Sequence, residues 1–107
     1  PVLDGFPFTV PQLPVTLPTL DESLGSLTAG EFASETARLA NVRNGYACFT
    51  AHAETEGLAY ASVLETILRR LDRPVAPLRE AALGGLPVRE IVRGRVKGRA
   101  DEICLQK

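Results

Sequence analysis

The side chains best suited to chemistry gather in the middle of the 107-residue chain, between positions 48 and 56. Cys48 and His52 are four residues apart, so on a helix they would share a face, with Glu56 one turn later. Together with Cys104 they could offer four ligands to a metal ion. A closed zinc site usually shows two ligand pairs at short spacing, and this chain has one. The sequence therefore predicts structural roles for these residues, with no metal and no other cofactor.

A catalytic use of Cys48 and His52 would need a third group that orients the base and a pocket that receives an oxyanion. A pair on one helix face offers neither. Glu54 and Glu56 would point apart on a helix, because they are only two positions apart. The chain has no G-x-S-x-G motif, no phosphate-binding glycine loop and no H-E-x-x-H motif. We therefore expect no catalytic residue and no enzymatic activity.

A basic run in the last twenty residues is the one stretch that favours nucleic acid. Five positive charges fall within eleven residues, namely Arg89, Arg93, Arg95, Lys97 and Arg99. The run and the segment before it loosely fit two helices joined by a glycine turn, as in DNA-reading helix pairs. The run has no Asn, Gln or Ser to read base edges and no aromatic ring to stack on bases. The favoured interpretation is a solvated or intersubunit face, and nucleic-acid binding is the alternative.

The element that must position the central residues is a predicted long helix over residues 46–71. Apolar and small residues recur there three or four positions apart, as on one face of an amphipathic helix. Such a helix would be about 40 Å long, at about 1.5 Å per residue. Gly57 could kink it. The stripe consists of Tyr46, Phe49, Thr50, Ala53, Gly57, Tyr60, Ala61, Leu64, Ile67, Leu68 and Leu71.

Two shorter helices are expected on either side of the long one. Thr28 and Glu31 fit a capping box that begins a helix. Asn44-Gly45 would interrupt it, either as a helix end with a left-handed residue or as a two-residue hairpin turn. Further along, Pro77 suits the first position of a short helix that ends at a glycine pair.

The last segment, residues 88–104, has two interpretations. Its apolar spacing favours a helix. Gly94 and Gly98 disfavour that helix by about 1 kcal/mol each and leave open a β-hairpin that turns at Lys97-Gly98.

Residues 1–22 form an apolar arm rich in proline. The prolines exclude a helix interior and a central strand. Between them, apolar residues alternate so that each trio lies on one face of an extended chain. The trios are Phe6, Phe8 and Val10, then Leu13, Val15 and Leu17. Because no charge lies between Asp4 and Asp21, we expect the arm to be covered by its own domain or by a second molecule.

Composition limits the classes of partner. The net charge of −1 gives no long-range attraction to nucleic acid or to an anionic membrane. Two cysteines do not make a disulfide framework, and we expect a cytoplasmic protein with reduced thiols. No secretory signal and no apolar stretch of about 20 residues is visible, so no membrane partner is expected.

These patterns together predict a mainly α fold, a small bundle of three to four helices with an extended Pro-rich arm. The arm would be residues 1–22 and the helical domain residues 23–107, within one domain overall. The apolar stripe exceeds what a short partner helix can cover, so we expect a non-enzymatic interaction or assembly protein. It would act as a dimer or higher homo-oligomer, or on another protein. The expected contact residues are Phe6, Phe8, Val10, Leu13, Val15, Tyr60, Leu64, Ile67 and Leu68.

Overall fold

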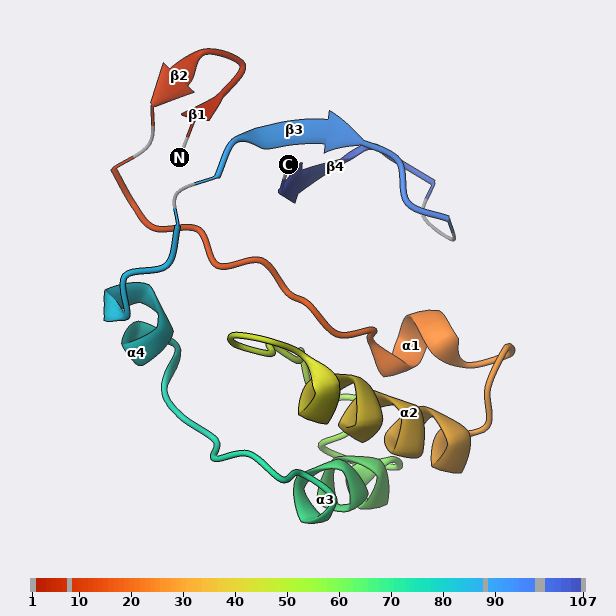
Figure 1. Cartoon of the computed structure of the whole chain (residues 1–107). Helices are drawn as coiled ribbons and strands as arrows, with labels where there is room; N and C mark the ends of the chain where they lie inside the picture. Colours follow the sequence, from red (N-terminus) through yellow and green to blue (C-terminus); the bar gives the residue numbers. More distant parts are fainter. Residues whose placement is uncertain (1, 8, 88, 98–99, 107) are drawn as a thin grey trace. The chain divides into compact units, whose positions relative to one another are not determined.

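The computed structural model describes residues 2–7, 9–87, 89–97 and 100–106 (Figure 1). The described residues form four helices: α1 (Leu20–Ser23), α2 (Ala29–Val42), α3 (Ala61–Arg69) and α4 (Leu78–Leu83). They also form two antiparallel pairs of strands, β1 (Val2–Leu3) with β2 (Phe6–Pro7), and β3 (Ile91–Gly94) with β4 (Ile103–Gln106). The predicted mainly α bundle is therefore wrong, because the fold mixes short helices with two small sheets. None of the described helices is long and apolar enough to cross a membrane.

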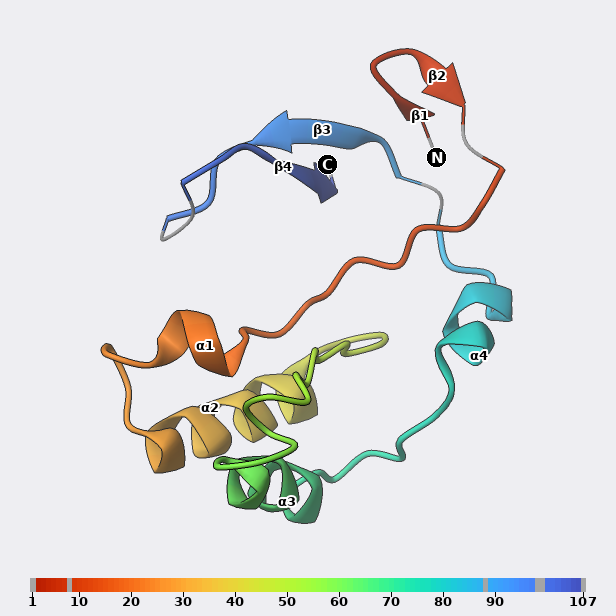
Figure 2. The ribbon, with the colours of Figure 1, turned by 180° about the vertical axis from the view of Figure 1, so that it is seen from behind.

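The chain divides into two compact units. Residues 15–75 form one unit, which contains α1, α2 and α3. Residues 1–14 and 76–107 form the other, which contains α4 and both sheets (Figure 2). The division falls inside the predicted arm, so its two halves belong to different units.

The capping box predicted for α2 is confirmed. Thr28 Oγ1 accepts a hydrogen bond from the Glu31 backbone N–H at 3.2 Å, and Glu31 Oε2 accepts one from the Thr28 N–H at 2.8 Å. Two amide groups that begin the helix without intrahelical partners are thereby satisfied. At the C-terminal end of α2, Arg73 Nη1 donates hydrogen bonds to the carbonyl oxygens of Ala40 and Arg43 at 2.9 and 3.0 Å. A cation there also complements the negative end of the helix dipole.

The core of the 15–75 unit lies where α1, α2 and α3 meet, with α2 and α3 side by side in both views (Figures 1 and 2). Its buried members are Leu20, Phe32, Ala33, Val63 and Ile67. Phe49 and Tyr60 pack against this cluster, and the rings of Phe32 and Phe49 lie 6.2 Å apart between centroids. The small side chains of α2 let neighbouring segments of the same unit pack closely against it, and Phe32 is only 1% exposed.

The predicted long helix over residues 46–71 is wrong for more than half of its length. Residues 46–52 have no regular secondary structure, residues 53–60 form successive turns, and α3 begins at Ala61. The cause is a competing set of backbone partners in the arm. Cys48 O accepts from the N–H groups of Thr16 and Leu17 at 3.0 and 3.1 Å, and Cys48 N–H donates to Thr16 Oγ1 at 2.8 Å. These bonds use the backbone groups that a helix would need.

In the other unit the chain begins with a hairpin, which the prediction of an extended arm missed. Leu3 pairs with Phe6, so only Asp4 and Gly5 form the turn. Both residues have positive φ, 50° and 83°. This is the backbone of a type I′ turn, which Asp-Gly adopts readily.

The last segment is a hairpin, so the favoured helix over residues 88–104 is wrong. Strands β3 and β4 pair from Ile91 with Gln106 to Gly94 with Ile103. Gly94 is the last residue of β3, and Gly98, where the alternative prediction placed the turn with Lys97, lies outside the described residues. Helix α4 follows its prediction, with Pro77 before its first residue and Gly84 at its end.

We predict that Phe32→Ala lowers the free energy of unfolding of the 15–75 unit by about 3–5 kcal/mol, because it leaves a cavity in the core. Urea denaturation followed by circular dichroism measures the change. Leu68→Ala is the matched control, since Leu68 lies on α3 with 49% exposure and should cost under about 1 kcal/mol. Equal losses for the two variants would mean that the core lies elsewhere.

Candidate functional site

The candidate site in the 15–75 unit centres on His52, the one histidine of the chain. Its Nδ1 atom is buried and makes no hydrogen bond to the described residues, while the side chain as a whole is 36% exposed. The exposed surface therefore belongs to the rest of the side chain. Asp21 Oδ1 lies 3.9 Å from Nδ1, which is too long for a hydrogen bond but close enough to stabilise a protonated ring.

Asp21 is held in place by the two residues before it, Thr19 and Leu20, at the start of α1. Leu20 is completely buried in the core, and Thr19 is 8% exposed, so the main chain around Asp21 is anchored on both the core and the arm side. The nearby Thr19 hydroxyl has the largest effect and lowers the pKa of Asp21; burial opposes it less strongly, and His52 lowers the pKa by less still. Thr19 Oγ1 makes no hydrogen bond of ordinary geometry to the described residues, so it acts on Asp21 as a nearby dipole. The Asp21 carboxylate is therefore ionised wherever histidine titrates.

Glu56 is the second acidic group of the site, and it is 2% exposed. Its Oε2 atom accepts from the His52 backbone N–H at 2.9 Å and from the Thr55 hydroxyl. Oε1 is also buried and has no hydrogen-bond partner among the described residues. Burial disfavours the charge, but the hydrogen bonds from Thr55 and His52 outweigh it and lower the pKa of Glu56.

The predicted spacing of Cys48, His52 and Glu56 on one helix face does not occur, because these residues are not in a helix. Glu56 contacts the main chain of His52, while Cys48 bonds to Thr16 through its backbone. Cys104 belongs to the other unit. Within the part of the chain that the structure describes, no group of three or more His, Cys, Asp and Glu side chains could hold a metal ion.

The predicted contact residues of the arm and helix differ widely in exposure. Phe6, Val10, Val15 and Leu68 are exposed, whereas Leu13, Tyr60 and Leu64 are partly buried. Ile67 is 3% exposed and belongs to the core. Phe8 lies outside the described residues. Self-association stays a prediction, although the continuous helix over residues 46–71 that suggested it is absent.

The residues of the basic run differ in their surroundings. The guanidinium of Arg93 donates to Asp4 Oδ2 through two nitrogens, at 3.0 and 3.1 Å, so part of its charge is neutralised within its own unit. Arg95 and Lys97 are exposed, and Arg99 lies outside the described residues. Arg89 is exposed and is one of the residues around a cavity of the same unit. Nucleic-acid binding stays a prediction for these residues.

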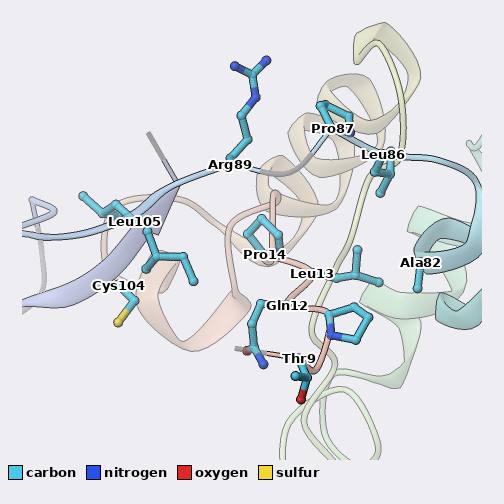
Figure 3. A pocket seen from close by; sticks show the side chains of 12 residues that line it. Thr9, Gln12, Leu13, Pro14, Ala82, Leu86, Pro87, Arg89, Cys104 and Leu105 are labelled. Carbon is cyan, nitrogen blue, oxygen red and sulfur yellow. The ribbon is translucent and has the colours of Figure 1, made fainter. Parts of the chain in front are cut away.

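That cavity, of about 430 Å³, lies in the unit of residues 1–14 and 76–107 and is lined mostly by apolar side chains (Figure 3). The first half of the arm contributes Leu13 and Pro14 to the lining. The segment after α4 contributes Leu86 and Pro87, and strand β4 contributes Leu105. Figure 3 shows the Arg89 guanidinium turned away from these side chains. Leu13, which was predicted to contact a partner, is partly buried and lines this cavity.

Comparison with known proteins finds a similarity to a sugar deformylase. The chain is 38% identical over 60 residues to the probable 4-deoxy-4-formamido-L-arabinose-phosphoundecaprenol deformylase ArnD of Shewanella sediminis (strain HAW-EB3). The aligned part covers 54% of this chain and 19% of that protein, so the match spans about a fifth of the relative's length. No family model matches the chain, and no solved structure matches it.

The matched stretch includes the candidate site wherever it begins. Because 54% of 107 residues is about 58, any continuous stretch of that length contains residues 50–58. His52, Thr55 and Glu56 therefore all fall within it. The similarity supports a relation to an enzyme, which the prediction of no activity did not anticipate.

Sequence reasoning missed Asp21 and Thr55 as members of the site. Asp21 is 31 positions before His52, and no local spacing could link the two. Thr55 carried a weak signal, since it lies between two glutamates and directly before Glu56-Gly57, a combination that favours a turn.

We predict that Glu56→Gln lowers the free energy of unfolding by about 1–3 kcal/mol at neutral pH, because a hydrogen-bonded carboxylate is lost. The folded-state pKa of Glu56 lies below its ordinary value of 4.5. The stabilisation is therefore complete above about pH 5 and disappears as the pH falls through the folded-state pKa. Urea denaturation from pH 7 to pH 3 should show the wild-type and Glu56→Gln curves converging.

The control is Glu54→Gln, because Glu54 is exposed on the same turn. Its curve should follow the wild type at every pH. A constant gap between wild type and Glu56→Gln over the whole range would mean that the charge of Glu56 does not stabilise the fold.

Proposed function

We propose that this chain carries the acid–base group of a hydrolase that removes a formyl group from an amino sugar, with His52 as that group. The observation that carries the proposal is the similarity to a deformylase over a stretch that includes His52. The geometry supports it, because a histidine with one buried ring nitrogen beside a carboxylate is suited to proton transfer.

The reaction is the hydrolysis of a formamide. A water oxygen adds to the formyl carbon, the carbon–nitrogen bond breaks, and the products are formate and the free amine. One proton must leave the water and another must reach the departing nitrogen. A histidine ring can both accept and donate a proton, so His52 can perform either transfer.

Asp21 would act on His52 rather than on the substrate. Its carboxylate faces Nδ1, the buried ring nitrogen, at 3.9 Å. A negative charge there stabilises the ring after it has accepted a proton. Proton exchange with substrate then falls to the other side of the ring, which is consistent with the partial exposure of the side chain.

The test is formate release from a 4-deoxy-4-formamido-L-arabinose glycoside, measured with a coupled formate dehydrogenase. We expect His52→Gln to lower kcat/KM by about a hundredfold or more, the usual size of an acid–base contribution. Asp21→Asn should cause a smaller loss, because the acid–base group itself remains. Circular dichroism confirms that each variant is folded.

Glu54→Gln again serves as the control and should release formate at the wild-type rate. Two results would reject the proposal. One is no formate from the wild-type chain at any substrate concentration. The other is a His52→Gln variant as active as the wild type.

A further inference from the structure

We infer that Glu56 is a positioning residue for His52: its buried carboxylate holds the His52 main chain, and so sets where the ring stands relative to Asp21. This inference rests on the proposed function of His52. It concerns a residue that never needs to touch substrate, since Glu56 is 2% exposed.

The first step is that both backbone groups of His52 are bound by the turn that follows it. The N–H donates to Glu56 Oε2 at 2.9 Å. The carbonyl oxygen accepts from the N–H groups of Thr55 and Gly57, each at 3.2 Å. The Thr55 hydroxyl links the two sets of contacts, because it approaches both the His52 carbonyl and Glu56 Oε2. His52 is thus held from both sides by residues 55–57.

The second step is that a charged side chain is an unusual choice for a site so buried. Burying a carboxylate is costly unless hydrogen bonds compensate, and an apolar side chain of similar size would pack there without that cost. An apolar residue, however, would leave the His52 N–H without its acceptor. The hydrogen bond that it accepts from the His52 N–H therefore explains why a carboxylate occupies this buried position.

The third step comes from Gly57. A Cβ atom at this position would collide with the carbonyl oxygen of Ala53 and lie 2.9 Å from both the carbonyl carbon and Cα of Ala53. All three are backbone atoms, which cannot move aside cheaply. The turn can therefore close around Glu56 only with glycine at position 57. Glu56 and Gly57 thus both maintain the turn that holds His52.

Fixing the His52 backbone matters because catalytic groups lose rate steeply when misplaced. A displacement of about 1 Å can cost about a hundredfold in rate. The ring of His52 is attached to a main chain without helix or strand, so its position depends on these turn contacts. Removing the acceptor at Glu56 should thus lower kcat while leaving KM almost unchanged.

The experiment compares Glu56→Ala, Glu56→Gln and Thr55→Val in the full chain. An amide oxygen still accepts from the His52 N–H, so Glu56→Gln should keep most of the wild-type kcat. Glu56→Ala should lower kcat by about a hundredfold. Thr55→Val, which removes the hydroxyl and keeps the shape, should lower kcat less but in the same direction. The matched control is Ile67→Val, which weakens the core and leaves the turn intact.

A second readout is independent of activity. The exchange rate of the His52 amide proton, measured by nitrogen-15 NMR, should be slow in the wild type and in Glu56→Gln and fast in Glu56→Ala. Amides of α2 should keep their wild-type protection. If Glu56→Ala does not fold, Thr55→Val and Glu56→Gln carry the same comparison.

The outcomes separate the inference from the proposed function. A wild-type chain without formate release defeats the proposed function, while the amide exchange still decides whether Glu56 holds His52. An active wild type whose Glu56→Ala variant loses no more kcat than Ile67→Val overturns the inference. So does a His52 amide that exchanges equally slowly with and without the carboxylate.

Discussion

The hydrogen bonds of residues 48–57 run to the arm and to a buried carboxylate, and the 15–75 unit depends on these partners. Cys48 bonds to Thr16 and Leu17, which places the second half of the arm over the helices of its own unit. Leu17 and Leu20 are buried there. A few residues later, Glu56 binds the main chain of His52. A helix through the same residues would use these backbone groups for its own hydrogen bonds and break these contacts.

The elements that were predictable are those specified by neighbouring residues. Thr28 and Glu31 satisfy each other within one turn, so the start of α2 can be read without knowledge of the rest. Pro77 and Gly84 bound α4 in the same way. The Asp4-Gly5 turn carried an equally local signal, and the apolar alternation of the arm distracted from it.

The long helix was mistaken because its signal was periodicity alone. Phe49, Tyr60 and Ile67 of the predicted stripe do reach the core, and Val63, which the stripe did not include, is buried there with them. They do so through a non-helical segment and a series of turns. The spacing of apolar residues leaves open the path of the backbone between them. What decides that path is Thr16, which lies 32 positions before Cys48 in the sequence.

The candidate site was hidden for the same reason. On a helix, His52 would have Cys48 and Glu56 as neighbours on one face, and neither would orient its ring. In the turn, Glu56 holds the backbone of His52 and Asp21 approaches Nδ1 from α1. Glu56 reaches His52 through the local turn, whereas Asp21 comes from 31 positions earlier in the chain, which no spacing in the sequence indicates.

The most direct test of this account is the set of carbon-13 Cα and Cβ secondary chemical shifts across residues 46–69 of the full chain. The account predicts non-helical shifts over residues 46–52, turn-like shifts over residues 53–60, and helical shifts beginning at Ala61. An unbroken run of helical shifts from residue 46 to residue 69 would contradict it, because His52 could then have neither its contact with Glu56 nor its place beside Asp21.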